Sequence, residues 1–332
     1  MSPQFKVYVT DIGWPSLAAE LEVLDSLDAV LEIAPDCTDQ QMAEYARDAD
    51  AIMTCWRTIP PDVVSAAEQC RVICRYGIGL DNIPVALATE LGIVVANVPD
   101  FCLDELTDQV MAGILALSRQ LPVLDASVKR GEWSRDTAVP LRQLRGQTLG
   151  LLGFGNTARH LVPKAQAFGL NVLAYTPRLA AADLPEDVVW AQSFRNLLET
   201  SDWLSIHAPL TSETAGLFDD RAFAAMKDSA ILINTSRGAI IDEPALNRAL
   251  TSGSIAGAVL DVLTTEPPTS DIPWRDHPNV LMTPHSAFLS EESLRTLATR
   301  TAQNVASVLM GQVPDSVINP EVLGRDNCRI QA

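Results

Sequence analysis

Short apolar runs alternate with helix-length amphipathic segments along the chain, and this alternation constrains the fold more than any other feature. The runs are long enough for strands and too short for core helices. Such alternation is typical of βαβ units, whose strands are parallel, so we expect an α/β fold built on parallel sheets. The expected strands cover Phe5–Thr10, Ala29–Ile33, Ala51–Cys55, Val72–Arg75, Ile93–Ala96, Thr148–Leu152, Asn171–Ala174, Trp203–His207, Ala230–Asn234, Gly257–Asp261 and Val280–Thr283.

The strands form two series, separated by one long helical pattern over about residues 104–130. A chain of 332 residues has room for two domains, each with its own core. A last helix, over about residues 291–310, begins after the second series is complete and could return to the first domain. We therefore expect a discontinuous substrate domain of residues 1–100 and 288–332, with a flavodoxin-like sheet. Residues 101–287 would form a doubly wound, Rossmann-like nucleotide-binding domain.

The acidic charge balance excludes several classes of partner. Lys and Arg number 24 against 42 Asp and Glu, which gives a net charge of −18. Binding to nucleic acid or to an anionic membrane surface needs clustered Lys and Arg, so neither partner is expected. Small anions enclosed in a site are still allowed, because distant surface charge is screened over about 8 Å in physiological salt.

The cysteines and the apolar segments point to a cytoplasmic protein without a structural metal. None of the six cysteines belongs to a CxxC pair, so neither a zinc site nor a disulfide framework is expected. No apolar run approaches the roughly 18 residues that a membrane span needs. Asp11 interrupts the apolar run at the N-terminus, which argues against a signal peptide.

A glycine-rich turn follows the strand Thr148–Leu152 and opens a helix, in the order that dinucleotide-binding folds require. Gly153 permits the tight turn, Gly155 lets the backbone approach a pyrophosphate, and Ala158 allows close packing of helix on sheet. The helix N-terminus then offers amide groups and a positive dipole end to the phosphates. The predicted cofactor-binding residues here are Gly153, Phe154, Gly155, Asn156 and Thr157.

The end of the next strand leaves the choice between NAD and NADP open. An Asp or Glu usually binds the ribose hydroxyls of NAD at this position. This chain has Thr176 there, and Arg178 follows two residues later. An arginine could pair with a 2′-phosphate, so the sequence leans toward NADP. The alternative is that Arg178 only covers the adenine or points into solvent.

Four further motifs follow the ends of predicted strands, and together they carry a resemblance to one family. They are Arg75-Tyr76-Gly77-Ile78-Gly79-Leu80-Asp81-Asn82, Asn234-Thr235-Ser236-Arg237-Gly238, Asp261-Val262-Leu263-Thr264-Thr265-Glu266-Pro267 and Thr283-Pro284-His285-Ser286. With them the chain resembles the D-isomer-specific 2-hydroxyacid dehydrogenases over about residues 49–320. The segments 97–102 and 285–292 are most similar to the branch of C-terminal-binding proteins and phosphoglycerate dehydrogenases.

The resemblance implies an NAD(P)-dependent oxidoreductase that transfers hydride between nicotinamide and a D-2-hydroxy or 2-keto acid, in a cleft between the two domains. The implied catalytic residues are Arg237, Glu266 and His285. His285 would be the acid/base, Glu266 would stabilise its imidazolium form, and Arg237 would bind the substrate carboxylate. The resemblance also implies a homodimer, formed through the helical region near residues 102–130, after which Trp133 follows.

Further binding residues follow from the same resemblance. The backbone amides of Gly77, Ile78 and Gly79 would bind the substrate carboxylate, and Phe288 stands where the similar branch usually has Trp. Arg57 follows a predicted strand and could meet a second anionic group on the substrate, or it could be an ordinary loop arginine. The remaining predicted cofactor-binding residues are His207, Ala208, Pro209, Thr235, Ser236, Asp261 and Gln109.

Two alternative functions stay open at this point. C-terminal-binding-protein relatives include dimers that sense NAD(H) and recruit partners, so the chain could be an interaction module of that type. A dehydrogenase acting on a non-carboxylate acid such as a phosphonate is the other alternative. The complete set of Arg237, Glu266 and His285 favours chemistry over sensing.

Overall fold

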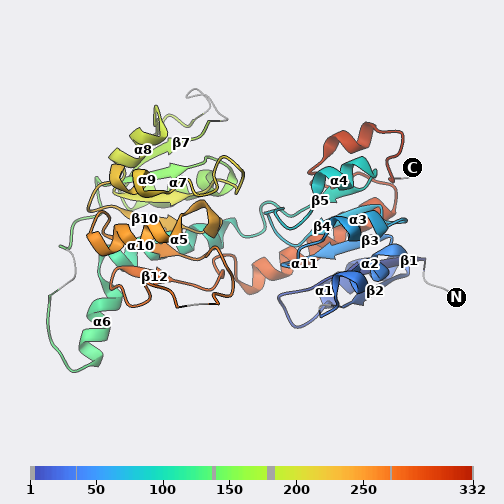
Figure 1. Ribbon diagram of the computed structural model, residues 1–332, viewed down its shortest axis with the longest axis horizontal. Helices are drawn as coiled ribbons and strands as arrows, with labels where there is room; N and C mark the ends of the chain where they lie inside the picture. Colours follow the sequence, from blue (N-terminus) through green and yellow to red (C-terminus); the bar gives the residue numbers. More distant parts are fainter. Residues whose placement is uncertain (1–3, 35, 137–139, 178–183, 270, 331–332) are drawn as a thin grey trace. The chain divides into compact units, whose positions relative to one another are not determined.

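A computed structural model describes residues 4–34, 36–136, 140–177, 184–269 and 271–330. The chain divides into two compact units, each with one parallel sheet flanked by helices (Figure 1). Unit 1 comprises Met1–Phe101 and Ser290–Ala332, and unit 2 comprises Cys102–Leu289. The expected α/β class with two parallel-sheet domains is confirmed.

The sheet of unit 1 has five parallel strands in the order β2-β1-β3-β4-β5, which is the flavodoxin-like order. Strands β3, β4 and β5 are buried along their whole length, which explains why they read as continuous apolar runs. The edge strand β2 is only partly buried. The strands are β1 (Phe5–Val9), β2 (Ala29–Ile33), β3 (Ala51–Thr54), β4 (Val72–Arg75) and β5 (Val94–Ala96).

The helices of unit 1 include one that comes from the end of the chain. Helix α11 begins at Glu291, where Ser290 and Ser293 form a reciprocal capping box, and it packs against α1 and β4. Unit 1 is therefore made from two separate stretches of sequence. Its helices are α1 (Ala18–Leu24), α2 (Asp39–Arg47), α3 (Pro61–Ala66), α4 (Val85–Glu90) and α11 (Glu291–Leu309), with 3₁₀ turns η1 (Asp25–Leu27) and η4 (Pro320–Gly324).

The sheet of unit 2 has seven parallel strands in the order β12-β11-β10-β9-β6-β7-β8. The chain runs outward in one direction from β6 and in the other from β9, so these neighbours mark a topological switch point. Strand β8 was not expected from the sequence, because it is a three-residue edge strand. The strands are β6 (Thr148–Leu152), β7 (Asn171–Tyr175), β8 (Val188–Trp190), β9 (Trp203–Ile206), β10 (Ile231–Asn234), β11 (Gly257–Leu260) and β12 (Val280–Met282).

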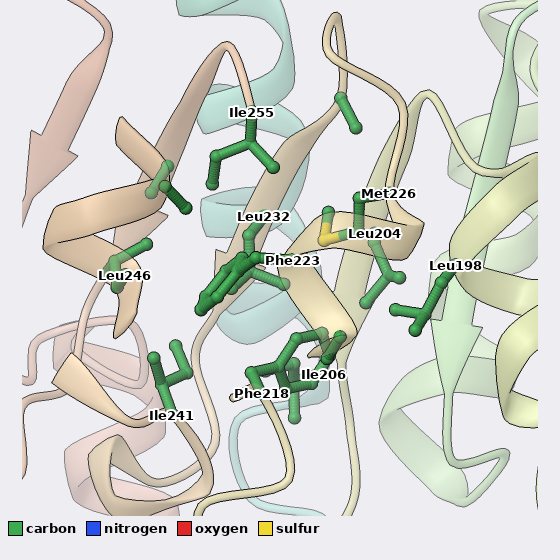
Figure 2. Packing of buried hydrophobic residues seen from close by; sticks show 14 of the residues in the cluster. Leu198, Leu204, Ile206, Phe218, Phe223, Met226, Leu232, Ile241, Leu246 and Ile255 are labelled. Atoms are coloured by element: carbon green, nitrogen blue, oxygen red, sulfur yellow. The ribbon is translucent and has the colours of Figure 1, made fainter. Parts of the chain in front are cut away.

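Helices cover both faces of this second sheet. On one face Phe218, Phe223 and Leu246 pack with Leu204 and Leu232 of the strands (Figure 2). On the other face α5 and α7 pack together. The helices are α5 (Leu103–Ser118), α6 (Leu121–Lys129), α7 (Asn156–Ala167), α8 (Phe194–Thr200), α9 (Asp220–Ala225) and α10 (Glu243–Ser252), with the 3₁₀ turn η3 (Gly238–Ile240).

The single long helix expected near residues 104–130 is two helices. Helix α5 ends at Ser118, and Gln120 adopts a left-handed conformation with φ of 51° before α6 begins. Pro122 lies in the first turn of α6, where its fixed φ and missing N–H favour the start of a new helix. The apolar periodicity continues across the break, which is why the sequence pattern alone suggested one helix.

Candidate active site

The carboxyl ends of the strands of unit 2 gather the predicted cofactor and catalytic residues at one edge of the sheet. Gly153 follows β6 and His207 follows β9, on the two sides of the switch point. Arg237, Asp261 and His285 follow β10, β11 and β12 in turn. Ligands of open α/β sheets bind at this edge, because the strand order reverses there and leaves a crevice.

The glycine turn after β6 has the geometry that a dinucleotide needs. Gly153 has φ of +91°, and a Cβ there would lie 2.6 Å from the carbonyl oxygen of His207. Gly155 caps α7 without a side-chain hydrogen bond, and a Cβ built on it would meet nothing within 4 Å. Asn156 and Thr157, in the first turn of α7, have backbone amides with no acceptor inside the helix, and such amides beside open space suit a pyrophosphate. The neighbouring Phe154 is buried.

The loop after β9 is tied to the loop after β10. The Ser236 hydroxyl donates to the carbonyl oxygen of Ala208 at 2.6 Å, while Pro209 is exposed on the same loop. His207 contacts the Ser205 hydroxyl through Nε2 at 2.9 Å, and burial lowers the pKa of its imidazole to about 4. The imidazole is therefore neutral at pH 7, in keeping with a wall residue and not with an acid/base.

The residues that bear on the 2′-position lie at the end of β7. Thr176 is buried directly after the strand. Arg178, which the sequence suggested as a partner for a 2′-phosphate, lies outside the described residues.

His285 and Glu266 form a hydrogen-bonded pair. His285 Nδ1 lies 2.6 Å from Glu266 Oε2, and the other carboxylate oxygen accepts from the Leu263 amide at 2.8 Å. Partial burial alone would raise the pKa of Glu266, but the hydrogen bonds from His285 and Leu263, with the charge of Arg237, lower it below its usual value. Glu266 is thus an anion at neutral pH that fixes the orientation of the imidazole.

The Arg237 loop is held by a buried asparagine at the end of β10. Asn234 donates to the Arg237 carbonyl oxygen at 2.8 Å and accepts from the Ser236 amide at 2.9 Å. The Arg237 Nη1 atom donates to the Ser236 carbonyl oxygen at 2.8 Å. A Cβ on Gly238 would lie 2.0 Å from the carbonyl carbon of Leu263, so glycine lets this loop lie directly on the loop that leads to Glu266. Thr235, which lies between Asn234 and Ser236 in the sequence, is partly exposed.

Asp261 binds the loop that carries His285. Its side chain, 2% exposed, accepts from the Thr283 hydroxyl at 2.6 Å and from the Ser286 and Ala287 amides at 2.9 and 3.0 Å. Gln109 of α5 contacts the same group, because its side-chain amide donates to the Thr283 hydroxyl at 3.0 Å. The sequence suggested cofactor contacts for both residues, and the structure adds these protein partners.

Phe288 lies near the imidazole of His285. Its ring and that of His285 have centroids 6.2 Å apart with an interplanar angle of 83°, an edge-to-face arrangement. The sequence predicted that Phe288 borders the substrate. Its ring contacts the imidazole of His285.

The predicted substrate residues Gly77, Ile78 and Gly79 lie in unit 1, after β4. Gly77 has φ of +133°, and a Cβ there would lie 1.8 Å from the guanidinium of Arg75. The Ile78 carbonyl oxygen accepts from the Asn97 side chain at 2.9 Å. The loop conformation therefore depends on glycine and on this asparagine. Ile78 is exposed and Gly79 is partly exposed.

Arg57 makes contacts within unit 1. Its guanidinium donates to the Cys37 carbonyl oxygen and lies 3.7 Å from a carboxylate oxygen of Asp39. The backbone around it is fixed by Asp11, whose carboxylate accepts from the amides of Trp56 and Arg57 at 2.7 and 3.2 Å. These contacts suit the ordinary structural alternative for this arginine.

Three site features escaped the sequence analysis. Asn234 and Thr283 belong to motifs named above. Their hydrogen bonds to the site loops, however, depend on which strand ends lie side by side. Asn97 supports the glycine loop from the next strand of the sheet. The available signal in the sequence was weak: Asn234 is the last residue of an apolar strand, and Thr283 and Asn97 come directly after one.

A family comparison agrees with this arrangement. The model of the NAD-binding domain of D-isomer-specific 2-hydroxyacid dehydrogenases matches residues 111–287, which is more than half of the chain. The chain belongs to the D-isomer-specific 2-hydroxyacid dehydrogenase family. The resemblance inferred from the motifs is thereby confirmed, and the chain carries the family's NAD-binding domain.

Individual relatives span most of this chain. A D-3-phosphoglycerate dehydrogenase of Methanocaldococcus jannaschii is 36% identical over 318 residues, and the match covers 95% of this chain and 59% of that protein. The chain is therefore similar to part of that longer enzyme. A glyoxylate reductase of Thermococcus litoralis is 34% identical over 290 residues, covering 85% of this chain and 87% of its own. The crystal structure of an Aquifex aeolicus D-lactate dehydrogenase with NAD and lactic acid has a TM-score of 0.84 at 26% identity, covering 94% and 98% of the two chains.

The ranges that the structure describes contain neither a candidate metal cluster nor a candidate membrane-spanning helix. No cluster of three His, Cys, Asp or Glu side chains in that part of the chain could hold a metal ion. Over the same ranges, no helix combines the length and apolar character needed to cross a membrane.

Proposed function

We propose that this chain is an NAD(P)-dependent dehydrogenase that interconverts a D-2-hydroxy acid and the corresponding 2-keto acid. The observation that carries the proposal is the 2.6 Å contact between His285 and Glu266, with Arg237 near enough to help lower the pKa of Glu266. An oriented imidazole, a carboxylate and an arginine are the groups that carbonyl reduction of an anionic substrate needs. Relatives named for phosphoglycerate, glyoxylate and lactate chemistry support the class of acid.

The residues of the glycine turn fit a nicotinamide dinucleotide. The open space over Gly155 and the uncapped N-terminus of α7 provide room and amide donors for the pyrophosphate. The bound nicotinamide would supply or accept the hydride. We assign the contacts along the cofactor to the loops after β6, β9 and β10, which are neighbouring strands of the sheet.

The protein groups divide the remaining work of reduction. Arg237 binds the carboxylate and withdraws charge from the neighbouring carbonyl. Because Nδ1 of His285 faces Glu266, Nε2 is the atom that gives its proton to the carbonyl oxygen as hydride reaches the carbon. Glu266 stabilises the imidazolium before the transfer, and the neutral imidazole takes the proton back in the oxidation direction. The Gly77–Gly79 amides are proposed as further carboxylate donors from the family resemblance.

We propose a preference for NADP over NAD. Thr176, buried after β7, provides no carboxylate to bind the ribose hydroxyls or to repel a 2′-phosphate. Arg178 follows it in the sequence and could supply the positive charge.

We also propose that the protein works as a homodimer. Leu121 and Val128 of α6 are 55% and 48% exposed, and Trp133, shortly after the helix, is 89% exposed. Burying such side chains against a second copy is favourable, because apolar surface leaves water. Light scattering of wild type and Trp133→Asp would test this: the wild type should have twice the mass of a monomer, and the variant a larger monomer fraction. A monomeric wild type would remove the proposal.

The activity is tested by following absorbance at 340 nm with NADH and with NADPH over a panel of 2-keto acids. Glyoxylate, hydroxypyruvate and phosphohydroxypyruvate belong in the panel, with an acyl phosphonate as a non-carboxylate member. The proposal expects turnover of at least one 2-keto acid, abolished by His285→Ala while cofactor affinity is kept. Intact cofactor binding without any turnover would instead favour the NAD(H)-sensing alternative, and turnover of the phosphonate alone would change the substrate class.

A further inference from the structure

The hydroxyl of Thr283 links helix α5 to the loop that carries the catalytic base. Gln109 Nε2 donates to this hydroxyl at 3.0 Å, and the hydroxyl donates to Asp261 Oδ1 at 2.6 Å. A threonine hydroxyl has one proton, so accepting from Gln109 leaves that proton free to point at Asp261. The three side chains therefore form one directed chain of hydrogen bonds.

This chain of hydrogen bonds ends at Asp261, which binds the backbone of the turn at His285. His285 has φ of 51°, a left-handed conformation that is uncommon for a residue with a side chain. Its amide donates to the carbonyl oxygens of Asp261 and Thr283 at 2.7 and 3.0 Å, and the amides of Ser286 and Ala287 donate to the Asp261 carboxylate. Such a conformation persists where the surrounding contacts determine it, and here Asp261 provides most of them.

Close packing of α5 brings Gln109 to this place. Gly113, one helical turn further along, lies so near β11 that an added Cβ would be 2.8 Å from Val259. The glycine thus lets the helix approach the sheet beside β11, and β12 is the next strand. Gln109 and Thr283 meet there across 174 residues of sequence.

We propose that Gln109 is a positioning residue for the catalytic base, acting through Thr283 and Asp261. The proposal deepens the dehydrogenase function and rests on it for the role of His285. Loss of the Gln109 amide leaves the Thr283 hydroxyl free to rotate, and the Asp261 carboxylate then holds the His285 turn less firmly. The expected consequence is a less populated productive orientation of the imidazole, seen as lower kcat at unchanged cofactor affinity.

This role differs measurably from a direct contact with nicotinamide. A direct contact would weaken cofactor binding whatever residue occupies position 283. If Gln109 has a positioning role, replacing it should have no effect on kcat once the Thr283 hydroxyl is removed. The two roles therefore separate in a double-mutant cycle between the two positions.

The experiment compares Gln109→Met, Thr283→Val and the double variant. Methionine keeps helix propensity and approximate size without the donor, and Thr283→Ser keeps the hydroxyl as a rescue. Asp108→Asn, on the same helix and facing Lys164, is the matched control. The measurements are kcat, KM, cofactor dissociation constants from NAD(P)H fluorescence, melting temperature, and hydrogen exchange of the Ser286 and Ala287 amides.

Gln109→Met should lower kcat about three- to tenfold, the size of one net hydrogen bond, and speed exchange of both amides. Cofactor dissociation constants should stay within about twofold, because the cofactor is not the affected partner. In the Thr283→Val background the same change should have less than about a twofold effect, and Thr283→Ser should behave as wild type. Multiplying effects, or weaker cofactor binding in both backgrounds, would overturn the proposal.

The exchange measurement keeps this proposal separate from the activity itself. If wild type turns over no acid in the panel, the dehydrogenase proposal fails, while the hydrogen-bond chain is still judged by exchange. Unchanged exchange of Ser286 and Ala287 in Gln109→Met would then overturn the positioning role.

Discussion

His285 Nδ1 and Glu266 Oε2 lie 2.6 Å apart, although the two residues are 19 positions apart in the chain. The distance is that of a short charge-assisted hydrogen bond. It leaves Nε2, the second nitrogen of the ring, as the atom proposed to exchange a proton with the substrate. The contact also explains why the pKa of Glu266 is lowered despite partial burial, since the imidazole stabilises the anion.

Removing the charge of Glu266 should therefore damage catalysis more than binding. Glu266→Gln should lower kcat by about 10²-fold, within the range that acid–base groups contribute, with cofactor affinity retained. Steady-state kinetics and NAD(P)H fluorescence check this. Glu243→Gln is the matched control, because Glu243 accepts from the Thr264 amide in the same region. Equal losses in the two variants would show that the charge of Glu266 has no special role.

The two glycines of the cofactor turn should respond differently to alanine. Gly153→Ala places a Cβ 2.6 Å from the His207 carbonyl oxygen at a positive φ, so the free energy of unfolding should fall by about 2–3 kcal/mol. Gly155→Ala meets no protein atom within 4 Å and should fold normally, yet its methyl group occupies the space proposed for pyrophosphate. Chemical denaturation and cofactor titration separate the effects. Normal cofactor binding by Gly155→Ala would contradict the assignment.

His207 should make stability fall in mild acid. Burial lowers its folded pKa to about 4 from 6.5, so between these values the unfolded chain binds the extra proton. The stabilising contribution is therefore complete above about pH 6.5 and is lost as pH falls toward 4, on the order of 2 kcal/mol. Urea unfolding at pH 7 and pH 4.5 should show a smaller difference for His207→Gln.

A second histidine with a lowered pKa, His277, must be absent from both proteins in that measurement. Burial also lowers the pKa of His277, so both proteins should carry His277→Gln to cancel its contribution. A pH difference that is the same with and without His207 would assign the acid sensitivity to other groups.

The residue after β7 should control cofactor choice. Thr176→Asp places a carboxylate where NAD-binding folds carry their ribose ligand, and where it would repel a 2′-phosphate. The ratio of kcat/KM with NADPH to that with NADH should fall at least about tenfold. Thr176→Asn, of similar size without the charge, is the control and should change the ratio much less. An unchanged ratio in Thr176→Asp would mean that the 2′-position lies elsewhere.

The sequence by itself determined the class of fold and the membership of the family. Short continuous apolar runs between amphipathic helical segments specify buried parallel strands, because such strands are covered on both faces and tolerate few polar residues. Strands such as Thr148–Leu152 and Val72–Arg75 begin and end where the pattern predicted. The break at Gln120 and the short edge strand β8 escaped, because local turn geometry and edge pairing leave little trace in periodicity.

Only the tertiary structure decided how the site residues are supported. The sequence named His285 and Glu266 from motifs, but their 2.6 Å contact depends on how the loops after β11 and β12 fold. It gave no reason to connect Gln109 with Thr283, since a hydrogen bond across 174 residues requires a helix packed on the sheet. The pattern of residues along the chain indicates which segments become strands and helices, whereas the precision of an active site depends on neighbours in space.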